Sequence, residues 1–224
     1  SHTFSIFWWE IRHAPVKWTH LLWELFPGNK PNDKERIVIV RSYLQSVKRL
    51  DKEVLRLSEP HLSAEFTSST TGGRALDHVL ENIKTFEREK ESLRGRAEES
   101  VEAALSKTII EEGLGFRFGI IFPPTDFRFD EPPLLLVTSP RNEIKLEASI
   151  LIDNNIDSKT RSDIERKAEL DGQTSALVDN LSGLGTYPAI VSDRYELRQL
   201  TRTAAHEWLH NYWIFQPLGR SMWN

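Results

Sequence analysis

Residues 205–211, Ala-His-Glu-Trp-Leu-His-Asn, have the spacing in this chain that most clearly indicates metal chemistry. His206 and His210 are four residues apart, so on a helix they lie one turn apart on the same face, where both imidazoles can reach one metal ion. Glu207 is offset from that pair, and in sites of this pattern the glutamate acts on a metal-bound water rather than on the metal. The spacing predicts two histidine ligands with Glu207 as general base. The alternative is an ordinary amphipathic helix whose histidines happen to be four residues apart.

The residues around the motif predict a helix that follows a small sheet. Beyond Gly113 and Gly115 the hydrophobic pattern changes from helical to extended. We expect Asp193 to open the last helix, with Glu196 in the capping-box place. The other elements expected in this half are strands at 116–122, 134–138 and 144–152, the last two forming a hairpin, a polar helix at 158–170, a short strand at 176–178, a Gly-containing loop at 182–186 and an extended stretch at 187–191.

Two long amphipathic patterns precede this half and predict a helical hairpin. Apolar residues recur at three- and four-residue steps up to Ser58 and again from about Arg74 to Glu112. Asp33 can cap the first of these helices. The charge run at 86–91 is typical of a solvated helix face. A coiled-coil-like arm that binds a partner is the alternative, and the sequence leaves it open.

The N-terminal segment is rich in aromatic residues, with Arg12 and Lys17 among them. Pro15 should interrupt any single helix there. Tryptophan beside basic residues suits a membrane interface, because its ring is apolar and its N–H needs a polar neighbour. Packing of the segment onto the globular body is the competing interpretation. The aromatic residues are Phe4, Phe7, Trp8, Trp9, Trp18, Trp23 and Phe26.

Composition narrows the possible functions. The chain has 224 residues, is 39% hydrophobic and 28% charged, and carries a net charge of −4 without a block of one sign, so no nucleic-acid partner is expected. The absence of cysteine excludes disulfides, thiolate ligands and a cysteine nucleophile. No run of about 18 apolar residues is present to span a membrane. Because the chain starts at Ser1 and its one methionine is Met222, we interpret it as a fragment of a longer protein.

Small strands followed by a helix with His-Glu-x-x-His resemble the zincin metalloproteases from about Phe116 onward, and within them the gluzincins. A metzincin is not indicated, since its extended motif needs Gly and His where this chain has Trp213 and Gln216. The sequences at 187–188 (Tyr-Pro), 205–210 and 216–219 (Gln-Pro-Leu-Gly) also resemble a group of uncharacterised, membrane-associated bacterial proteins regarded as metallopeptidases. That resemblance implies membrane association of the full-length protein, on an unknown side, with this chain as a soluble part.

The resemblance implies a zinc peptidase that acts on peptide or protein substrates. Zn²⁺ would be bound by His206 and His210, and Glu207 would be the catalytic base. A gluzincin also needs a glutamate from a following helix, which in the bacterial group lies in an Asn-Glu-x-x-Ala segment, and no Glu, Asp, His or Cys follows His210. Two explanations stay open: the chain stops before that helix, or an upstream carboxylate serves, for which the sequence offers no strong candidate. We expect this stretch of chain to bind metal poorly and to be inactive by itself. Tyr187 and Tyr212 are candidate transition-state donors.

Together these patterns predict an α+β chain with three parts, whose oligomeric state is left open. They are a Trp-rich segment at 1–32, a helical hairpin at 33–112 and a zincin-like core at 113–224, with a small, mainly antiparallel sheet packed on the motif helix. Two alternatives to the peptidase remain. One is a non-catalytic interaction protein that binds partners through the hairpin and keeps a vestigial zincin domain. The other is a membrane-proximal module directed by the N-terminal segment.

Overall fold

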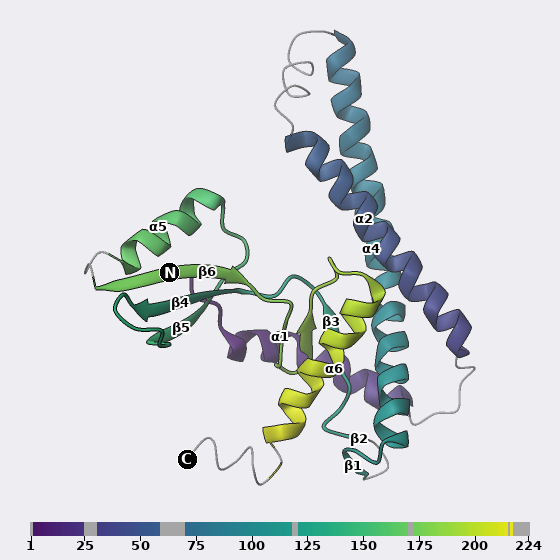
Figure 1. Ribbon diagram of the computed structural model, residues 1–224. Helices are drawn as coiled ribbons and strands as arrows, with labels where there is room; N and C mark the ends of the chain where they lie inside the picture. The colour runs from purple at the N-terminus through teal and green to yellow at the C-terminus, as the bar shows by residue number, and fades with distance from the viewer. Residues whose placement is uncertain are drawn as a thin grey trace. The chain divides into compact units, whose positions relative to one another are not determined.

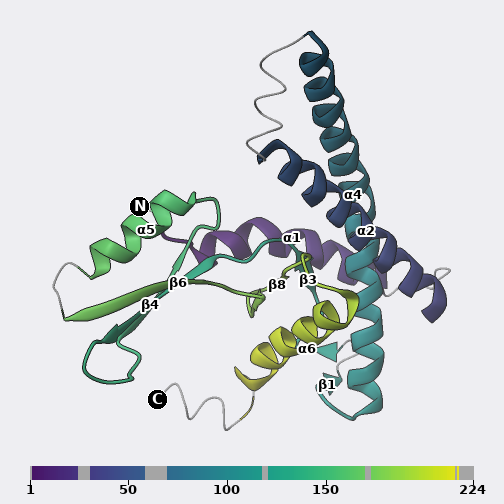
Figure 2. The same cartoon turned by 45° about the horizontal axis from the view of Figure 1, so that its top comes forward.

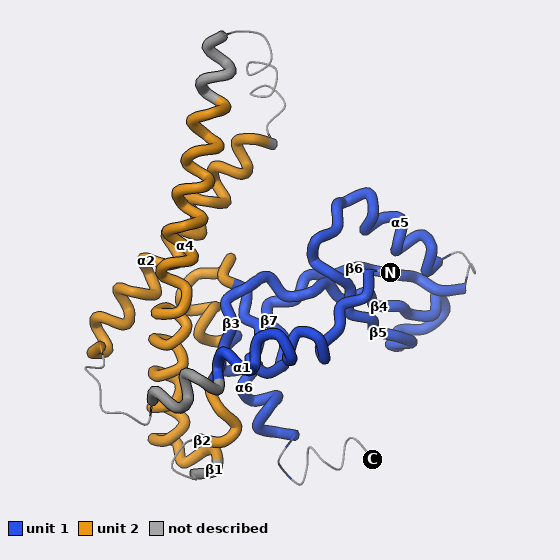
Figure 3. Tube along the Cα trace, turned by 180° about the vertical axis from the view of Figure 1, so that it is seen from behind, with its two compact units in different colours: residues 1–27, 126–192, 203–224 blue, residues 28–125, 193–202 orange. Residues whose placement is uncertain are grey.

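The computed structural model describes residues 2–24, 31–58, 70–117, 121–169, 173–214 and 216. The chain is α+β, as the sequence predicts, and five helices and eight short strands are described (Figure 1). Its contacts divide it into two compact units (Figure 3). Unit 1 comprises residues 1–27, 126–192 and 203–224, and unit 2 comprises residues 28–125 and 193–202. The N-terminal residues thus share a unit with the motif.

Unit 2 is built on the predicted helical hairpin. Helix α2 (Asp33–Ser58) packs against helix α4 (Thr70–Glu111), as the regular spacing of apolar residues indicates. The stretch expected as one strand at 116–122 instead contributes two short antiparallel strands, β1 (Phe116–Arg117) and β2 (Ile121–Phe122). The buried side chains of the hairpin include Val40, Tyr43, Leu44, Val47, Val79, Ala97, Val101 and Ile109.

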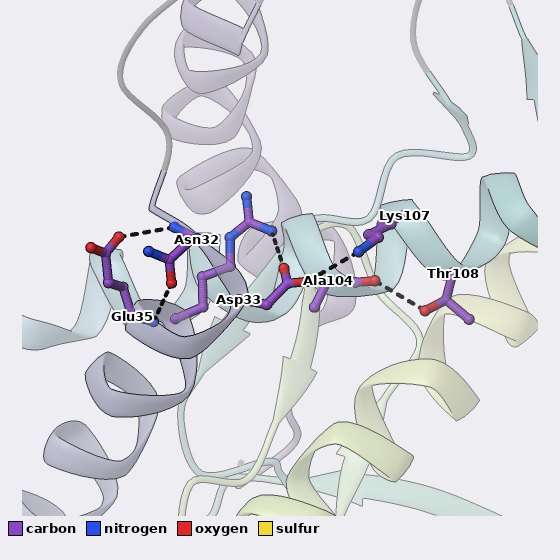
Figure 4. Close-up of polar contacts among 7 residues, drawn as sticks. Asn32, Asp33, Glu35, Ala104, Lys107 and Thr108 are labelled. Atoms are coloured by element: carbon purple, nitrogen blue, oxygen red, sulfur yellow. Dashed lines mark hydrogen bonds and ion pairs between the residues drawn. The ribbon is translucent and has the colours of Figure 1, made fainter.

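The start of α2 corrects the predicted cap (Figure 4). Asn32, not Asp33, caps the helix: its Oδ1 accepts from the Glu35 N–H at 3.0 Å, and its own N–H donates to Glu35 Oε2 at 2.9 Å. This is a reciprocal capping box displaced by one residue from the predicted position. The Asp33 carboxylate instead accepts from Lys107 Nζ of α4 at 3.0 Å and from Arg36 at 3.2 Å, so it links the two helices.

The last helix also begins later than expected. Helix α6 spans Leu197–Ile214, and Asp193 lies four residues before it. Asp193 is buried, and its carboxylate accepts from the Tyr43 hydroxyl at 2.5 Å and pairs with Lys90 at 2.8 Å. Glu196 pairs with Lys48. Both acidic side chains therefore bind the hairpin within unit 2, which is why neither forms the predicted capping box.

One sheet of unit 1 confirms the predicted hairpin of strands. Strand β4 (Leu134–Pro140) lies between β5 (Ala148–Ile152) and β6 (Thr174–Asn180), antiparallel to both. The expected strand at 144–152 is shorter, since β5 starts at Ala148. Helix α5 (Ser158–Ala168), capped by Asp157, covers one face of this sheet (Figure 2). The core under α5 consists of Leu134, Leu136, Ile152 and Val178, with Ile156, Ile164 and Ala176 against it.

The second sheet of unit 1 contains two strands that the sequence does not predict. Its order is β3-β8-β7, in which β3 (Phe127–Phe129) is parallel and β7 (Gly183–Leu184) antiparallel to β8 (Ala189–Val191). The predicted extended stretch at 187–191 includes β8. Strands β3 and β7 are three and two residues long, too short to show an alternating pattern, and β7 falls in the predicted Gly-containing loop.

Helix α1 (Ile6–Glu24) is a single helix that contains Pro15, so the predicted interruption is wrong. Proline removes only one backbone donor, and tertiary contacts of the first half offset that loss. Trp9 Nε1 donates to the Pro188 carbonyl at 3.3 Å, and the Tyr187 N–H donates to Glu10 at 3.0 Å. None of the helices in the described ranges is long and apolar enough to cross a membrane.

Candidate metal centre

The rotation of α6 about its axis determines which motif residues reach solvent. Ala204 and Trp208, one turn apart, are buried, and the Trp208 ring stacks on Tyr212 with ring centroids 5.1 Å apart. Burial of this apolar stripe is favourable because it removes the indole surface from water. His206 and His210 lie off this stripe and are exposed. Glu207 lies on the inward side and is only 5% exposed.

The two histidines converge as the spacing predicts. Their Nε2 atoms are 3.0 Å apart, and the rings meet edge to face with centroids 4.6 Å apart. Two nitrogens bound tetrahedrally to one zinc ion would be about 3.3 Å apart, given Zn–N bonds of about 2.0–2.1 Å. Burial, and then the neighbouring His206, lower the pKa of His210. The ring is therefore neutral at neutral pH, and this is the form that binds a metal ion.

Glu207 lies at the contact between α6 and strand β7. A Cβ atom added at Gly183 would lie 2.6 Å from Glu207 Oε1 and 2.8 Å from Thr203 Cγ2. The carboxyl group therefore occupies space that only glycine leaves open. Burial raises the pKa of Glu207 to about 7. A carboxyl with this pKa exchanges protons near neutral pH, which suits a general base.

A second glycine keeps the chain after β7 close to α6. A Cβ atom at Gly185 would lie 2.9 Å from His210 Cβ. One residue further along both segments, Asn211 Nδ2 donates to the Thr186 carbonyl at 3.2 Å. The Gly-x-Gly spacing was the available sequence signal for this contact. Gly183 and Gly185 are thus site residues that the motif alone does not identify.

The motif residues border a cavity of about 610 Å³ in unit 1. One wall consists of His206, Glu207 and His210, and residues 182–185 form another. Most of the remaining wall is apolar, so the cavity can enclose an apolar side chain next to the polar motif. The apolar residues are Leu135, Leu151, Leu181, Leu184, Trp213 and Ile214.

Strand β7 is an edge strand with free backbone groups at this cavity. The Ser192 N–H donates to the Ser182 carbonyl at 2.9 Å, so these two residues form a hydrogen-bonded pair. In an antiparallel ladder the next pair, Gly183 and Val191, directs its N–H and C=O groups away from the partner strand. No further strand pairs with β7 within the described ranges. The outward groups of Gly183 are therefore available beside Glu207.

The structure brings His206, Glu207 and His210 together, as two candidate metal ligands and a candidate base. In the part of the chain that the structure describes, no group of three or more His, Asp or Glu side chains is arranged to hold a metal ion. The donor type and spacing of His206 and His210 fit zinc, but a catalytic zinc site usually has three protein ligands. Neither candidate tyrosine is among the described residues that line the cavity: the Tyr187 hydroxyl bonds to Asp126, and Tyr212 stacks on Trp208.

No family model matches the chain, and comparisons with curated proteins and with solved structures likewise find no match.

Proposed function

We propose that this chain contains the catalytic part of a zinc-dependent peptidase of the gluzincin type. The supporting observation is the arrangement at α6. Two imidazole nitrogens 3.0 Å apart lie beside a buried glutamate, and all three residues border a cavity shared with an open edge strand. Metal binding, proton transfer and binding of an extended peptide each need one of these features.

His206 and His210 would hold the zinc ion through their Nε2 atoms. A bound zinc ion supplies Lewis acidity, which polarises the scissile carbonyl and makes water acidic enough to lose a proton near neutral pH. Glu207 would accept that proton and then donate it to the leaving amine. The contact with Gly183 keeps the carboxyl in one place, so little reorganisation is needed during the reaction.

Strand β7 would bind the substrate backbone. The outward N–H and C=O of Gly183 can form hydrogen bonds with an extended peptide, which adds a strand to the β3-β8-β7 sheet. The peptide would then pass Glu207 and the histidine pair. The apolar wall that includes Leu135, Leu151 and Leu184 would accept a bulky apolar side chain next to the scissile bond.

The third zinc ligand is proposed to be a glutamate outside the described residues, as in gluzincins. Two histidines bind zinc more weakly than a full set of three protein ligands. Zinc affinity should therefore be much higher in the full-length protein, if that glutamate is present, than with the two histidines alone. A helix with such a residue, packed beside α6, would complete the zincin-like arrangement.

Zinc content and peptide hydrolysis test the proposal. In the full-length protein one zinc per chain is expected, and His206→Ala or His210→Ala should abolish zinc binding. His78→Ala, on the exposed face of α4, should leave the zinc content unchanged. Glu207→Gln should keep the metal and lower kcat by about 10²–10⁴-fold. Glu143→Gln, in an exposed loop, is the matched control. Unchanged hydrolysis in Glu207→Gln would exclude the proposed base.

A non-catalytic interaction protein is the second candidate, and two observations favour it. The described residues supply no third ligand, and the hairpin exposes apolar side chains such as Val38 and Leu55. Such side chains can serve a partner helix. If the full-length protein binds no stoichiometric zinc, this candidate is supported over the peptidase.

A further inference from the structure

Unit 1 contains a second cavity, of about 540 Å³, that shares none of its lining residues with the candidate metal centre. Helix α1 forms one side of it through Trp8, Trp9 and Arg12. Arg128 of β3 and two acidic residues that follow strands, Asp130 and Asp153, form other parts of the wall. The peptidase proposal uses none of these residues.

The cavity is lined by equal numbers of positive and negative side chains, but these do not form salt bridges with one another. Arg12 and Arg128 are positive, and Asp130 and Asp153 are negative. Within the described ranges, no salt bridge joins either arginine to either aspartate, and Arg128 Nε is buried without a hydrogen-bond partner. A buried donor without a partner is unfavourable, so the described residues leave part of the hydrogen-bonding capacity of this guanidinium unused. A ligand with one negative and one positive group would satisfy both pairs.

The helix beside this cavity has an exposed apolar face. Trp9 and Glu10 bind the turn at Tyr187 and Pro188, which fixes the inner side of α1. On the other side, Phe7 is 64%, Trp8 66% and Ile11 50% exposed. Adjacent exposed aromatic side chains are uncommon on a soluble surface and mark an interaction site. Trp8 belongs both to this face and to the cavity wall.

We propose that this region binds the phosphoethanolamine headgroup of a lipid at a bilayer surface. Arg12 and Arg128 would bind the phosphate, and Asp130 and Asp153 the primary ammonium. Phe7, Trp8 and Ile11 would enter the interfacial layer, where aromatic side chains are favoured. Inorganic phosphate would leave the two carboxylates facing an anion, and a choline headgroup has no N–H to donate to them. The charge pattern therefore fits phosphoethanolamine better than either.

Vesicle flotation tests this proposal with the protein as it is. The vesicles would contain phosphatidylcholine alone, phosphatidylcholine with phosphatidylethanolamine, or phosphatidylcholine with phosphatidylglycerol. We expect the strongest binding to the vesicles with phosphatidylethanolamine. Equal binding to all three compositions, stronger binding to phosphatidylglycerol, or no binding would overturn the headgroup assignment. Abolition of the binding by millimolar inorganic phosphate would overturn it in favour of a phosphate site.

Variants separate the headgroup from the apolar face. Arg12→Gln and Arg128→Gln should each lower binding to phosphatidylethanolamine vesicles by about tenfold or more, because each removes a charged hydrogen-bond donor to the headgroup phosphate. Both should leave the weaker binding to phosphatidylcholine unchanged. The double variant Phe7→Ser/Trp8→Ser should lose binding to every composition. Arg166→Gln on α5 and Leu177→Ser on β6, both exposed, are the matched controls and should bind like the parent.

A soluble headgroup without acyl chains tests the cavity in the unsubstituted protein, so neither misfolding of a variant nor membrane insertion affects the result. Titration with glycerophosphoethanolamine, followed by the NMR signals of the tryptophan indole N–H groups, should shift Trp8 and Trp9 and leave Trp208 unchanged. Thermal unfolding identifies any variant that fails to fold. If a variant does not fold, the titration of the unsubstituted protein with glycerophosphoethanolamine tests the cavity assignment by itself. Shifts at Trp208, or none at Trp8 and Trp9, would contradict the cavity assignment. Zinc content plays no part, so failure of the peptidase proposal leaves this test unaffected.

Discussion

Strands β6 and β7 are both edge strands of sheets in unit 1, but only the outer edge of β6 is covered by other residues that the structure describes. The outer edge of β6 is covered by side chains of α5 and of the residue that follows it. The Val178 N–H donates to Glu165 at 2.8 Å, and the Ala176 N–H donates to Glu169 at 3.0 Å. The edge of β7 has no such cover and lies beside Glu207 at the cavity. Open edges invite pairing with other chains, so proteins usually block them. An edge left open beside a buried glutamate suggests that it serves to bind a strand.

Filling the space at the open edge should have the largest effect. Gly183→Ala adds a Cβ atom 2.6 Å from Glu207 Oε1, so the carboxyl must move. In the full-length protein we expect a loss of peptidase activity of about 10²-fold, and a destabilisation of about 1–3 kcal/mol. Steady-state kinetics and denaturant unfolding measure the two effects. Gly95→Ala on α4, where no atom lies within 4 Å, is the control and should leave activity unchanged.

Enlarging the cavity beside the open edge should have the next largest effect. Leu151→Ala shortens an apolar side chain of the wall and should lower the preference for bulky apolar residues by about tenfold or more. The ratio of kcat/KM for peptides with Leu and Ala at the same position measures this preference. An unchanged ratio in an active enzyme would show that the pocket does not select the side chain, while hydrolysis itself would still support the proposed function.

Removing the cover of the closed edge tests the other side of the comparison. Glu165→Ala leaves the Val178 N–H without its partner, so a destabilisation of about 1–3 kcal/mol is expected, together with self-association through β6. Denaturant unfolding and light scattering measure these effects. Lys159→Ala, exposed on the same helix, should change neither. If Glu165→Ala scatters light like the parent and is as stable, the side chain does not protect the edge.

The smallest effect concerns the cap of the covering helix and depends on pH. Hydrogen bonds from the side chain and then the backbone N–H of Thr160 lower the pKa of Asp157. A carboxyl whose pKa is lowered by folding stabilises the folded state above its unfolded pKa, near 4, and the stabilisation is lost as the pH falls through the folded pKa. Amide exchange in α5 should therefore accelerate as the pH is lowered below 4, relative to Asp157→Asn, which caps without ionising. The same pH profile in both proteins would show that Asp157 ionisation is not involved.

Local patterns were sufficient for several elements and insufficient for others. The hairpin helices, the β4–β5 pair and the helix around His206 follow from hydrophobic periodicity, which is a property of neighbouring residues. The predicted interruption of helix α1 at Pro15 was wrong because Trp9 and Glu10 contact residues about 180 positions away in the chain. The predicted helix start at Asp193 was wrong for the same reason, since its carboxylate binds Tyr43, 150 residues earlier in the chain.

For the candidate site, the sequence by itself determined the identities and the helical spacing of His206, Glu207 and His210. A period of 3.6 residues is enough to place the two imidazoles together. Only the tertiary structure decided that Glu207 is buried, that Gly183 provides its space and that β7 is the open edge at the cavity. These properties depend on contacts between residues distant in the chain, and a strand of two residues has no periodicity from which they could be predicted.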